Sequence, residues 1–78
     1  MDIKMPLLSQ RLKSLRSEKG VTQRELAELL GKTSRHYQDI ESGKINVPAL
    51  ALIQLADYFD VSLDYLVGRS EERHPNNA

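Results

Sequence analysis

Residues 22–43 read TQRELAELLGKTSRHYQDIESG, a stretch that carries the start and stop signals of two short helices. Thr22 is a good N-cap residue, and Glu25 three positions later completes a capping-box pattern. Gly31 is expected to end the first helix, because the turn between the helices requires a residue that tolerates a positive φ angle. Thr33 is then placed to cap the second helix. The stretch therefore predicts two helices joined by a tight turn of about three residues.

The apolar residues of this stretch suit a close crossing of the two helices. Ala27 is small where the second helix would pass over the first, and Gly31 follows it in the turn. Tyr37 and Ile40 have the spacing of residues that hold the second helix from beneath, and this helix should end near Ser42. The first helix would bury Leu26, Ala27, Leu29 and Leu30, and the second would expose Ser34, Arg35, His36, Gln38 and Asp39.

Apolar spacing also predicts helices before and after the hairpin. The first contains a leucine stripe made by Leu8, Leu12 and Leu15. Gly20 is expected to end it. Another helix should begin near Pro48 and run to Phe59. Its expected apolar face consists of Ala49, Leu52, Ile53, Ala56 and Phe59. Leu50 falls on the opposite side and is expected to be exposed.

The predicted fold class is all-α, with five helices, because no strand pattern is present. Ser62 should cap the fifth and shortest helix, over residues 63–67. We expect one domain over residues 8–68, preceded by an N-terminal arm of residues 1–7. Residues 69–78, RSEERHPNNA, are almost entirely polar, so we expect them to be disordered.

Composition excludes several kinds of protein. The 78 residues are enough for one small domain, and 40% of them are apolar. Cysteine is absent, which excludes disulfides and thiolate metal sites and suits a reducing cytoplasm. The first residues contain no apolar run long enough for a signal peptide, and no stretch approaches a transmembrane span of about 20 apolar residues.

The charges are unevenly distributed along the chain although the formal net charge is zero. Residues 1–44 hold nine Lys or Arg against six Asp or Glu, whereas residues 45–78 hold two against five. A basic half and an acidic half suit a protein that presents one end to a polyanion. The whole-chain balance alone argues weakly against nucleic acid.

The spacing of Gln23, Ala27, Gly31, Tyr37 and Ile40 resembles the helix-turn-helix of the lambda-repressor-like, or Xre-type, transcriptional regulators of bacteria and phages. The resemblance continues through RLKSLRSEKGVTQRELAELLG, IESGK and LIQLADYFDVSLDYLVG, and so covers about residues 8–68. It implies a compact five-helix domain whose second and third helices form the helix-turn-helix. It also implies a sequence-specific regulator that binds double-stranded DNA and acts in the cytoplasm.

By this resemblance, seven residues are expected to contact DNA: Gln23, Thr33, Ser34, Arg35, Gln38, Asp39 and Lys44. Gln23 and Lys44 would bind backbone phosphates, and the others would face the major groove. The residue chemistry agrees, because Arg35 can pair bidentately with guanine and Gln38 can read adenine. Asp39 could accept from a cytosine amine but would also repel phosphate. Without the rest of the motif, Gln23 would be read as a solvated first-turn residue, and the motif reverses that interpretation.

Arg16 and Glu41 resemble the pair that forms a structural salt bridge in this family, so neither is expected to read bases. Tyr37 is expected in the core with its hydroxyl at the edge. His36 has no neighbouring ligand residue, and the spacing of Asp57, Asp60 and Asp64 is not that of a calcium loop. We therefore expect no metal, no cofactor and no catalytic residue, and hence no enzyme.

The resemblance further implies a repressor that acts as a homodimer on a two-fold operator. The fifth helix and the end of the fourth would form the dimer surface. A physical reason for a dimer is that one domain of this size reads few bases and buries little surface. An alternative is a protein-interaction module, such as an antitoxin or accessory factor, that keeps the fold. Zero net charge, Asp39 on the reading helix and the exposed Leu50 favour that alternative.

Overall fold

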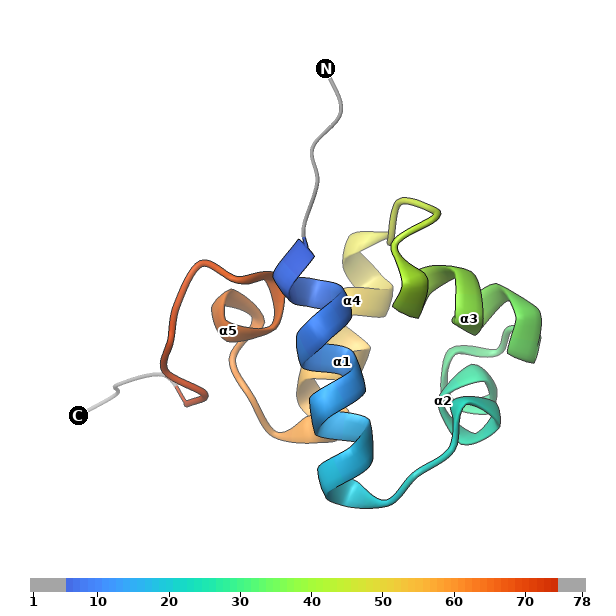
Figure 1. The fold of residues 1–78 in the computed structure, drawn as a ribbon, viewed down its shortest axis with the longest axis horizontal. Helices are drawn as coiled ribbons and strands as arrows, with labels where there is room; N and C mark the ends of the chain where they lie inside the picture. Colours follow the sequence, from blue (N-terminus) through green and yellow to red (C-terminus); the bar gives the residue numbers. More distant parts are fainter. Residues whose placement is uncertain (1–5, 75–78) are drawn as a thin grey trace.

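The computed structural model describes residues 6–74, which form five helices and no strand (Figure 1). The helices are α1 (Pro6–Lys19), α2 (Gln23–Leu30), α3 (Ser34–Ser42), α4 (Ala49–Phe59) and α5 (Leu63–Val67). The predicted all-α class and the five helices are confirmed. The predicted arm boundary at residue 7 falls inside α1, and the rest of that arm, residues 1–5, lies outside the described residues.

Side-chain caps start three of the helices where the sequence predicted them. The hydroxyl oxygens of Thr22, Thr33 and Ser62 accept hydrogen bonds from the backbone N–H three residues later, at 3.1, 3.1 and 3.0 Å. Pro48 is the N-cap of α4 rather than its first helical residue, and it makes no side-chain cap bond. Gly31 ends α2 with a φ of 68°, a conformation that costs glycine little. The α2–α3 turn therefore consists of residues 31–33.

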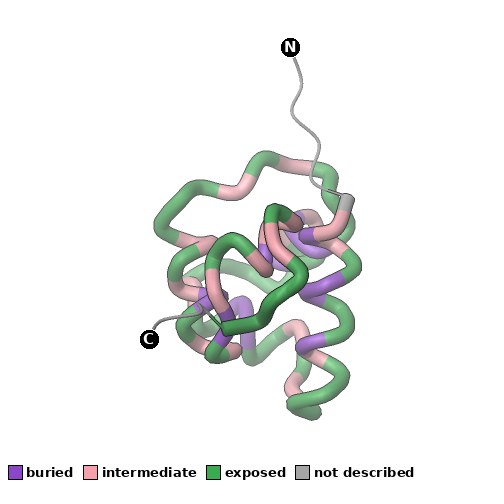
Figure 2. Tube along the Cα trace, turned by 90° about the vertical axis from the view of Figure 1, so that its left-hand side faces the viewer, coloured by how far each residue is buried: buried purple, intermediate pink, exposed green. Residues whose placement is uncertain are grey.

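Helix α1 runs through the middle of the molecule (Figure 1). It packs against α3 on one side and α5 on the other, while α2 contacts α3 and α4. The buried core, drawn in purple in Figure 2, takes residues from every helix. It consists of Leu8, Leu12, Leu15, Leu26, Ala27, Tyr37, Ile40, Leu55, Ala56, Val61 and Leu66. This arrangement leaves the outer side of the α2–α3 pair facing away from the core.

Two apolar faces differ from the prediction. Leu29 in α2 is 38% exposed, because it lies about 80° from the centre of the face formed by Leu26 and Leu30. In α4 the buried face is turned about the helix axis by roughly 40° from the predicted face, counted at about 100° per residue. Leu55 is therefore fully buried, whereas Ile53 is 44% exposed and Ala49 is also exposed.

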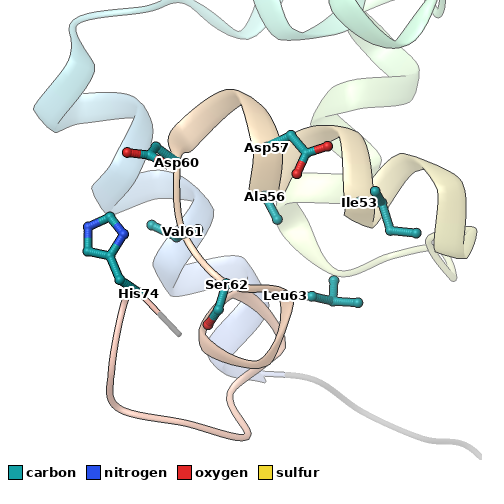
Figure 3. Close-up of a pocket in the computed structure, with 8 residues that line it drawn as sticks. All are labelled: Ile53, Ala56, Asp57, Asp60, Val61, Ser62, Leu63 and His74. Carbon is teal, nitrogen blue, oxygen red and sulfur yellow. The ribbon is translucent and has the colours of Figure 1, made fainter. Parts of the chain in front are cut away.

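A pocket opens where α4 ends and α5 begins (Figure 3). Its volume is about 340 Å³, and its lining residues are Ile53, Ala56, Asp57, Asp60, Val61, Ser62, Leu63 and His74. Apolar side chains from both helices meet here, with the carboxylates of Asp57 and Asp60 beside them. His74 comes from the segment after α5, so this segment forms part of the pocket wall.

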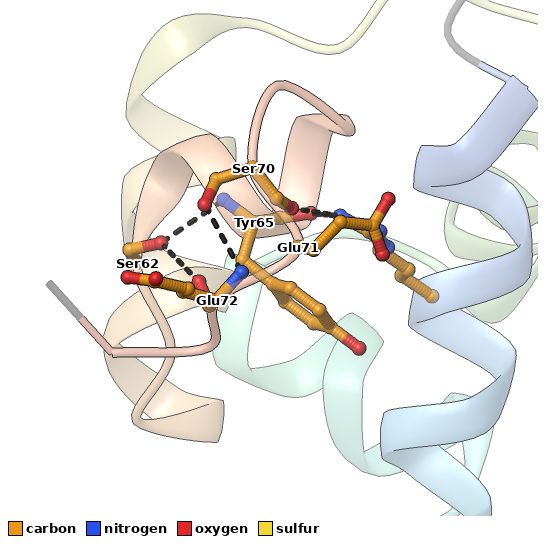
Figure 4. Close-up of polar contacts among 6 residues, drawn as sticks. Ser62, Tyr65, Ser70, Glu71 and Glu72 are labelled. Atoms are coloured by element: carbon orange, nitrogen blue, oxygen red, sulfur yellow. Dashed lines mark hydrogen bonds and ion pairs between the residues drawn. The ribbon is translucent and has the colours of Figure 1, made fainter.

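Residues 69–74 have a defined course against α1 and α5, so the prediction of disorder was wrong for this part of the tail. Figure 4 shows Ser70 and Glu72 hydrogen-bonded beside Ser62 at the start of α5. The buried Arg11 guanidinium donates to the carbonyl oxygens of Tyr65 and Ser70, the latter at 2.7 Å. A buried guanidinium requires acceptors, and the folded-back segment supplies two of them, the Ser70 carbonyl and, at 3.4 Å, the Glu71 carboxylate. Residues 75–78 lie outside the described residues.

A second arginine holds the same segment from outside. Arg73 donates to both carboxylate oxygens of Glu18 at 2.7 and 2.6 Å, and its backbone carbonyl accepts from the Ser62 N–H at 2.5 Å. The hydrogen bonds from Arg73 lower the pKa of the exposed Glu18 carboxyl. Residues 18 and 73 are far apart in the sequence, so this contact closes the segment onto the C-terminal end of α1.

Replacing Arg11 with Met should lower the free energy of unfolding by about 1–3 kcal/mol, because two partly buried carbonyl groups, those of Tyr65 and Ser70, lose their donor. Urea unfolding followed by circular dichroism measures this change. Arg73→Met is the matched control, and it should have a much smaller effect because the Arg73–Glu18 pair is exposed. Equal losses in the two variants would contradict the assigned role of Arg11.

The Tyr37 side chain is fully buried, and its hydroxyl has no hydrogen-bond partner within the described residues. The prediction of a hydroxyl at the edge of the core was therefore wrong. Burial raises the pKa of Tyr37, and the nearby negative charge of Glu41 raises it further.

Tyr37→Phe should leave the free energy of unfolding unchanged or raise it by up to about 1 kcal/mol, because it removes a desolvated hydroxyl. A decrease of more than about 1 kcal/mol in the free energy of unfolding, measured with urea, would show that the hydroxyl has a hydrogen-bond partner.

Candidate nucleic-acid interface

The α2–α3 hairpin presents one side of α3 to the outside. Tyr37, Ile40 and Glu41 form the buried side of α3 and fix its rotation against α1 and α2. The opposite side carries polar residues. Thr33, Ser34, Arg35 and Gln38 are exposed, and His36 and Asp39 are half-buried. The prediction of which residues face outward therefore holds for Ser34, Arg35 and Gln38. It holds only partly for His36 and Asp39.

Arg35 lies near the middle of this outer face with 80% of its side chain exposed. Its Nε atom is 3.8 Å from a carboxylate oxygen of Asp39, one helical turn later. An exposed pair of this spacing contributes about 0.3–0.5 kcal/mol, so Arg35 can exchange Asp39 for another acceptor at small cost. The pairing also reduces the positive charge that the face presents.

Further cations surround the outer face of α3. Lys44 follows the end of α3 and is exposed, as predicted from its loop position. Lys32 in the turn and Arg24 in the first turn of α2 are exposed as well. Arg24 pairs with Glu28 at 3.5 Å, on a part of α2 where both side chains are largely solvated. Lys32 lies in the α2–α3 turn, whereas Arg24 lies at the opposite end of α2.

Gln23, the first residue of α2, lies differently from the expectation of a solvent-facing contact. Its side chain is half-buried, and its Nε2 donates to Oε1 of Glu41 at 3.4 Å. The backbone N–H groups of the first turn of α2 lie beside the Gln23 side chain. Glu25 N–H bonds to the Thr22 hydroxyl and Leu26 N–H to the Thr22 carbonyl, so intrahelical bonding begins after Arg24. This end of α2 can therefore receive an anion.

Arg16 and Glu41 form a bidentate ion pair that joins α1 to α3. Arg16 Nε and Nη2 lie 3.0 and 3.1 Å from the two carboxylate oxygens of Glu41. The Glu41 side chain is only 2% exposed and that of Arg16 is 27% exposed. The hydrogen bonds to Glu41 raise the pKa of the Arg16 guanidinium. The hydroxyl of Ser9 also donates to the Glu41 backbone carbonyl, so α1 holds this end of α3 at two points.

Other kinds of site are not evident in the described part of the chain. Residues 6–74 contain no group of three or more His, Asp or Glu side chains arranged to hold a metal ion. None of the described helices is both long enough and apolar enough to cross a membrane.

Comparison with known proteins places the chain in a family. Residues 12–66, more than half of the chain, match the family model described as Helix-turn-helix. The chain is 38% identical over 68 residues to YqaE, named as an uncharacterized HTH-type transcriptional regulator of Bacillus subtilis. It is 33% identical over 71 residues to the HTH-type transcriptional regulator ImmR of the same organism. These matches cover 86% and 91% of this chain but only 59% and 56% of the two relatives.

A solved structure agrees with this placement. The crystal structure of a transcriptional regulator from Listeria innocua superposes with a TM-score of 0.76 and 34% sequence identity. The match covers 90% of this chain and 64% of the Listeria chain. The chain therefore spans less than two thirds of the length of each of these three proteins. It belongs to the lambda-repressor-like, or Xre-type, helix-turn-helix family of transcriptional regulators.

Proposed function

We propose that this chain is a sequence-specific repressor that binds double-stranded operator DNA with α3 in the major groove. The observation that carries the proposal is the division of α3 into two sides. Tyr37, Ile40 and Glu41 anchor the buried side, and the polar outer side is centred on Arg35. A helix held in this way can enter a groove without losing core contacts. The bacterial relatives are named as regulators and not as enzymes, which supports a cytoplasmic DNA-binding role.

The contacts divide into two kinds. Arg35 and Gln38 would read base edges, guanine through O6 and N7 and adenine through N6 and N7. Asp39 would accept from a cytosine amine, and it would disfavour binding where its carboxylate faces a phosphate. Thr33 and Ser34 would enter the groove at the start of α3. Gln23 and Lys44 would bind phosphates and so set the register of α3 on the duplex.

A homodimer on a two-fold operator would supply the contact area that one domain lacks. The predicted dimer surface, α5 and the end of α4, contains exposed apolar side chains beside the α4–α5 pocket. Ile53 is 44% exposed and Leu63 is 39% exposed, and both line that pocket. Leu50 is 68% exposed and precedes Ile53 by three residues, so the two are neighbours on the α4 surface. Ile53 and Leu63 are the apolar side chains that a second copy would cover.

A protein-interaction module is the alternative function, and the exposure of Leu50 is the observation that favours it. In that case the exposed side chains of Leu50, Ile53 and Leu63 would bind a different protein. The Arg35–Asp39 pair would then be a solvated surface pair without a role in base reading. The two functions predict different DNA affinities, because the interaction module would have little affinity for DNA.

Selection from random duplex DNA should recover a two-fold-related site. Arg35→Ala should then weaken binding to that site by about 1–3 kcal/mol and relax one base position in each half-site. Lys44→Ala should weaken binding to all sequences and reduce the salt slope by about 1. Arg69→Ala, which removes an exposed arginine after α5, is the matched control and should have little effect. Equal effects of Arg35→Ala and Arg69→Ala, or no enriched site, would contradict the proposal.

Leu63→Glu should shift the protein from dimer to monomer in analytical ultracentrifugation, because a carboxylate would be buried in the dimer surface. Leu29→Glu is a matched control, since Leu29 is 38% exposed and lies on α2 away from the pocket. It should leave the oligomeric state unchanged. If the unmodified protein is monomeric when bound to a full operator, the dimer is ruled out, and Ile53 and Leu63 would be assigned to a different partner.

A further inference from the structure

The buried Glu41 carboxylate accepts from two different side chains. Its Oε2 accepts from Arg16 Nε at 3.0 Å, and its Oε1 accepts from Arg16 Nη2 at 3.1 Å. The same Oε1 also accepts from Nε2 of Gln23 at 3.4 Å. Arg16 comes from α1, Gln23 from the first turn of α2 and Glu41 from the last turn of α3. One carboxylate thus connects all three helices at the edge of the candidate interface.

This contact restricts the side chain of Gln23. A glutamine amide has two N–H donors and one carbonyl acceptor. One N–H of Gln23 is directed at Glu41, which leaves the second N–H and the carbonyl for other partners. An unrestrained glutamine would lose rotamer freedom when it bound a ligand, whereas a side chain that is already held loses less.

The charges around the contact are compatible with an anion. The guanidinium of Arg16 neutralises the Glu41 carboxylate through two hydrogen bonds, so the carboxylate does not present an uncompensated negative charge. The first backbone N–H groups of α2 lie beside Gln23 and precede the intrahelical hydrogen bonds. A phosphate at this position would meet the helix N-terminus and the remaining amide N–H together.

We propose that Glu41 is a positioning residue for DNA binding, in addition to its part in the salt bridge. It holds the Gln23 amide so that the second N–H is directed to a DNA phosphate oxygen at the start of α2. This inference rests on the proposed function, because it assigns a role within DNA binding. It has a structural consequence as well. Since Glu41 belongs to α3, it also fixes the position of the α2 phosphate contact relative to α3.

The test must remove the acceptor of Gln23 without unfolding the domain. Replacing both partners of a buried ion pair with apolar residues of similar volume is often neutral or stabilising. The variant Arg16→Met/Glu41→Met therefore deletes the acceptor, keeps the net charge and retains the fold, which circular dichroism checks. It is combined with Gln23→Ala in a double-mutant cycle, and operator affinity is measured for all four proteins at one salt concentration.

We expect the paired Met variant and Gln23→Ala each to weaken binding by about tenfold, the loss of one charge-assisted hydrogen bond. The protein with all three substitutions should bind no more weakly than Gln23→Ala alone. Lys44→Ala provides the control, because its effect should multiply with that of the paired variant. The positioning role would be overturned if the losses of affinity from Gln23→Ala and from the paired variant multiplied. It would also be overturned if the folded paired variant kept full affinity.

A second measurement needs no DNA. The side-chain amide protons of Gln23 should have chemical shifts displaced from random-coil positions in the ¹H–¹⁵N spectrum of the unmodified protein, and these should return to random-coil positions in the paired variant. If that variant does not fold, Glu41→Asp, which shortens the acceptor, replaces it in both measurements. Random-coil signals in the unmodified protein would overturn the inference. Absence of DNA binding by the unmodified protein would instead overturn the proposed function itself.

Discussion

The ion pair between Arg16 and Glu41 joins α1 to α3 and sets the placement of α3 on which the candidate interface depends. A carboxylate that is 2% exposed must be paired, and loss of one partner of such a pair costs about 3–5 kcal/mol. The bidentate geometry permits only a narrow range of positions for α3 relative to α1. The net contribution to stability can still be small, because the Glu41 carboxylate lost its water on burial. The value of the pair lies in fixing which side of α3 faces outward, and therefore which residues can reach a ligand.

Local signals explain why most of the fold could be predicted from the sequence. The caps at Thr22, Thr33 and Ser62 and the left-handed Gly31 depend on neighbours within a few residues, so a pattern of residues reveals them. The anchoring of α3 by Tyr37 was visible for the same reason. The rotation of α4 was not, because Ile53 and Leu55 are both apolar, and only packing against the other helices decides between them.

The parts that could not be predicted are contacts between distant residues. Arg11 and Ser70 are 59 positions apart, and nothing in the polar composition of residues 69–74 indicates that this segment folds back. The expected DNA contacts were identified by position, but the sequence did not show that Gln23 bonds to Glu41, 18 positions away. Arg35 and Asp39, by contrast, are one helical turn apart, a spacing that allows their pairing. These pairings matter for function because they determine how much positive charge is available to an anion. A chain with zero net charge can still present a cationic face if its carboxylates are paired elsewhere.

The measurement that tests the account most directly is a ¹H–¹⁵N titration of the protein with the operator duplex. Backbone amides of residues 33–39, the first turn of α2 and Lys44 should change most, with small changes around the α4–α5 pocket beyond those caused by dimer formation. This result would show that the outer side of α3 is the binding surface. Changes confined to the surface of Leu50, Ile53 and Leu63, with α3 unaffected, would contradict the account.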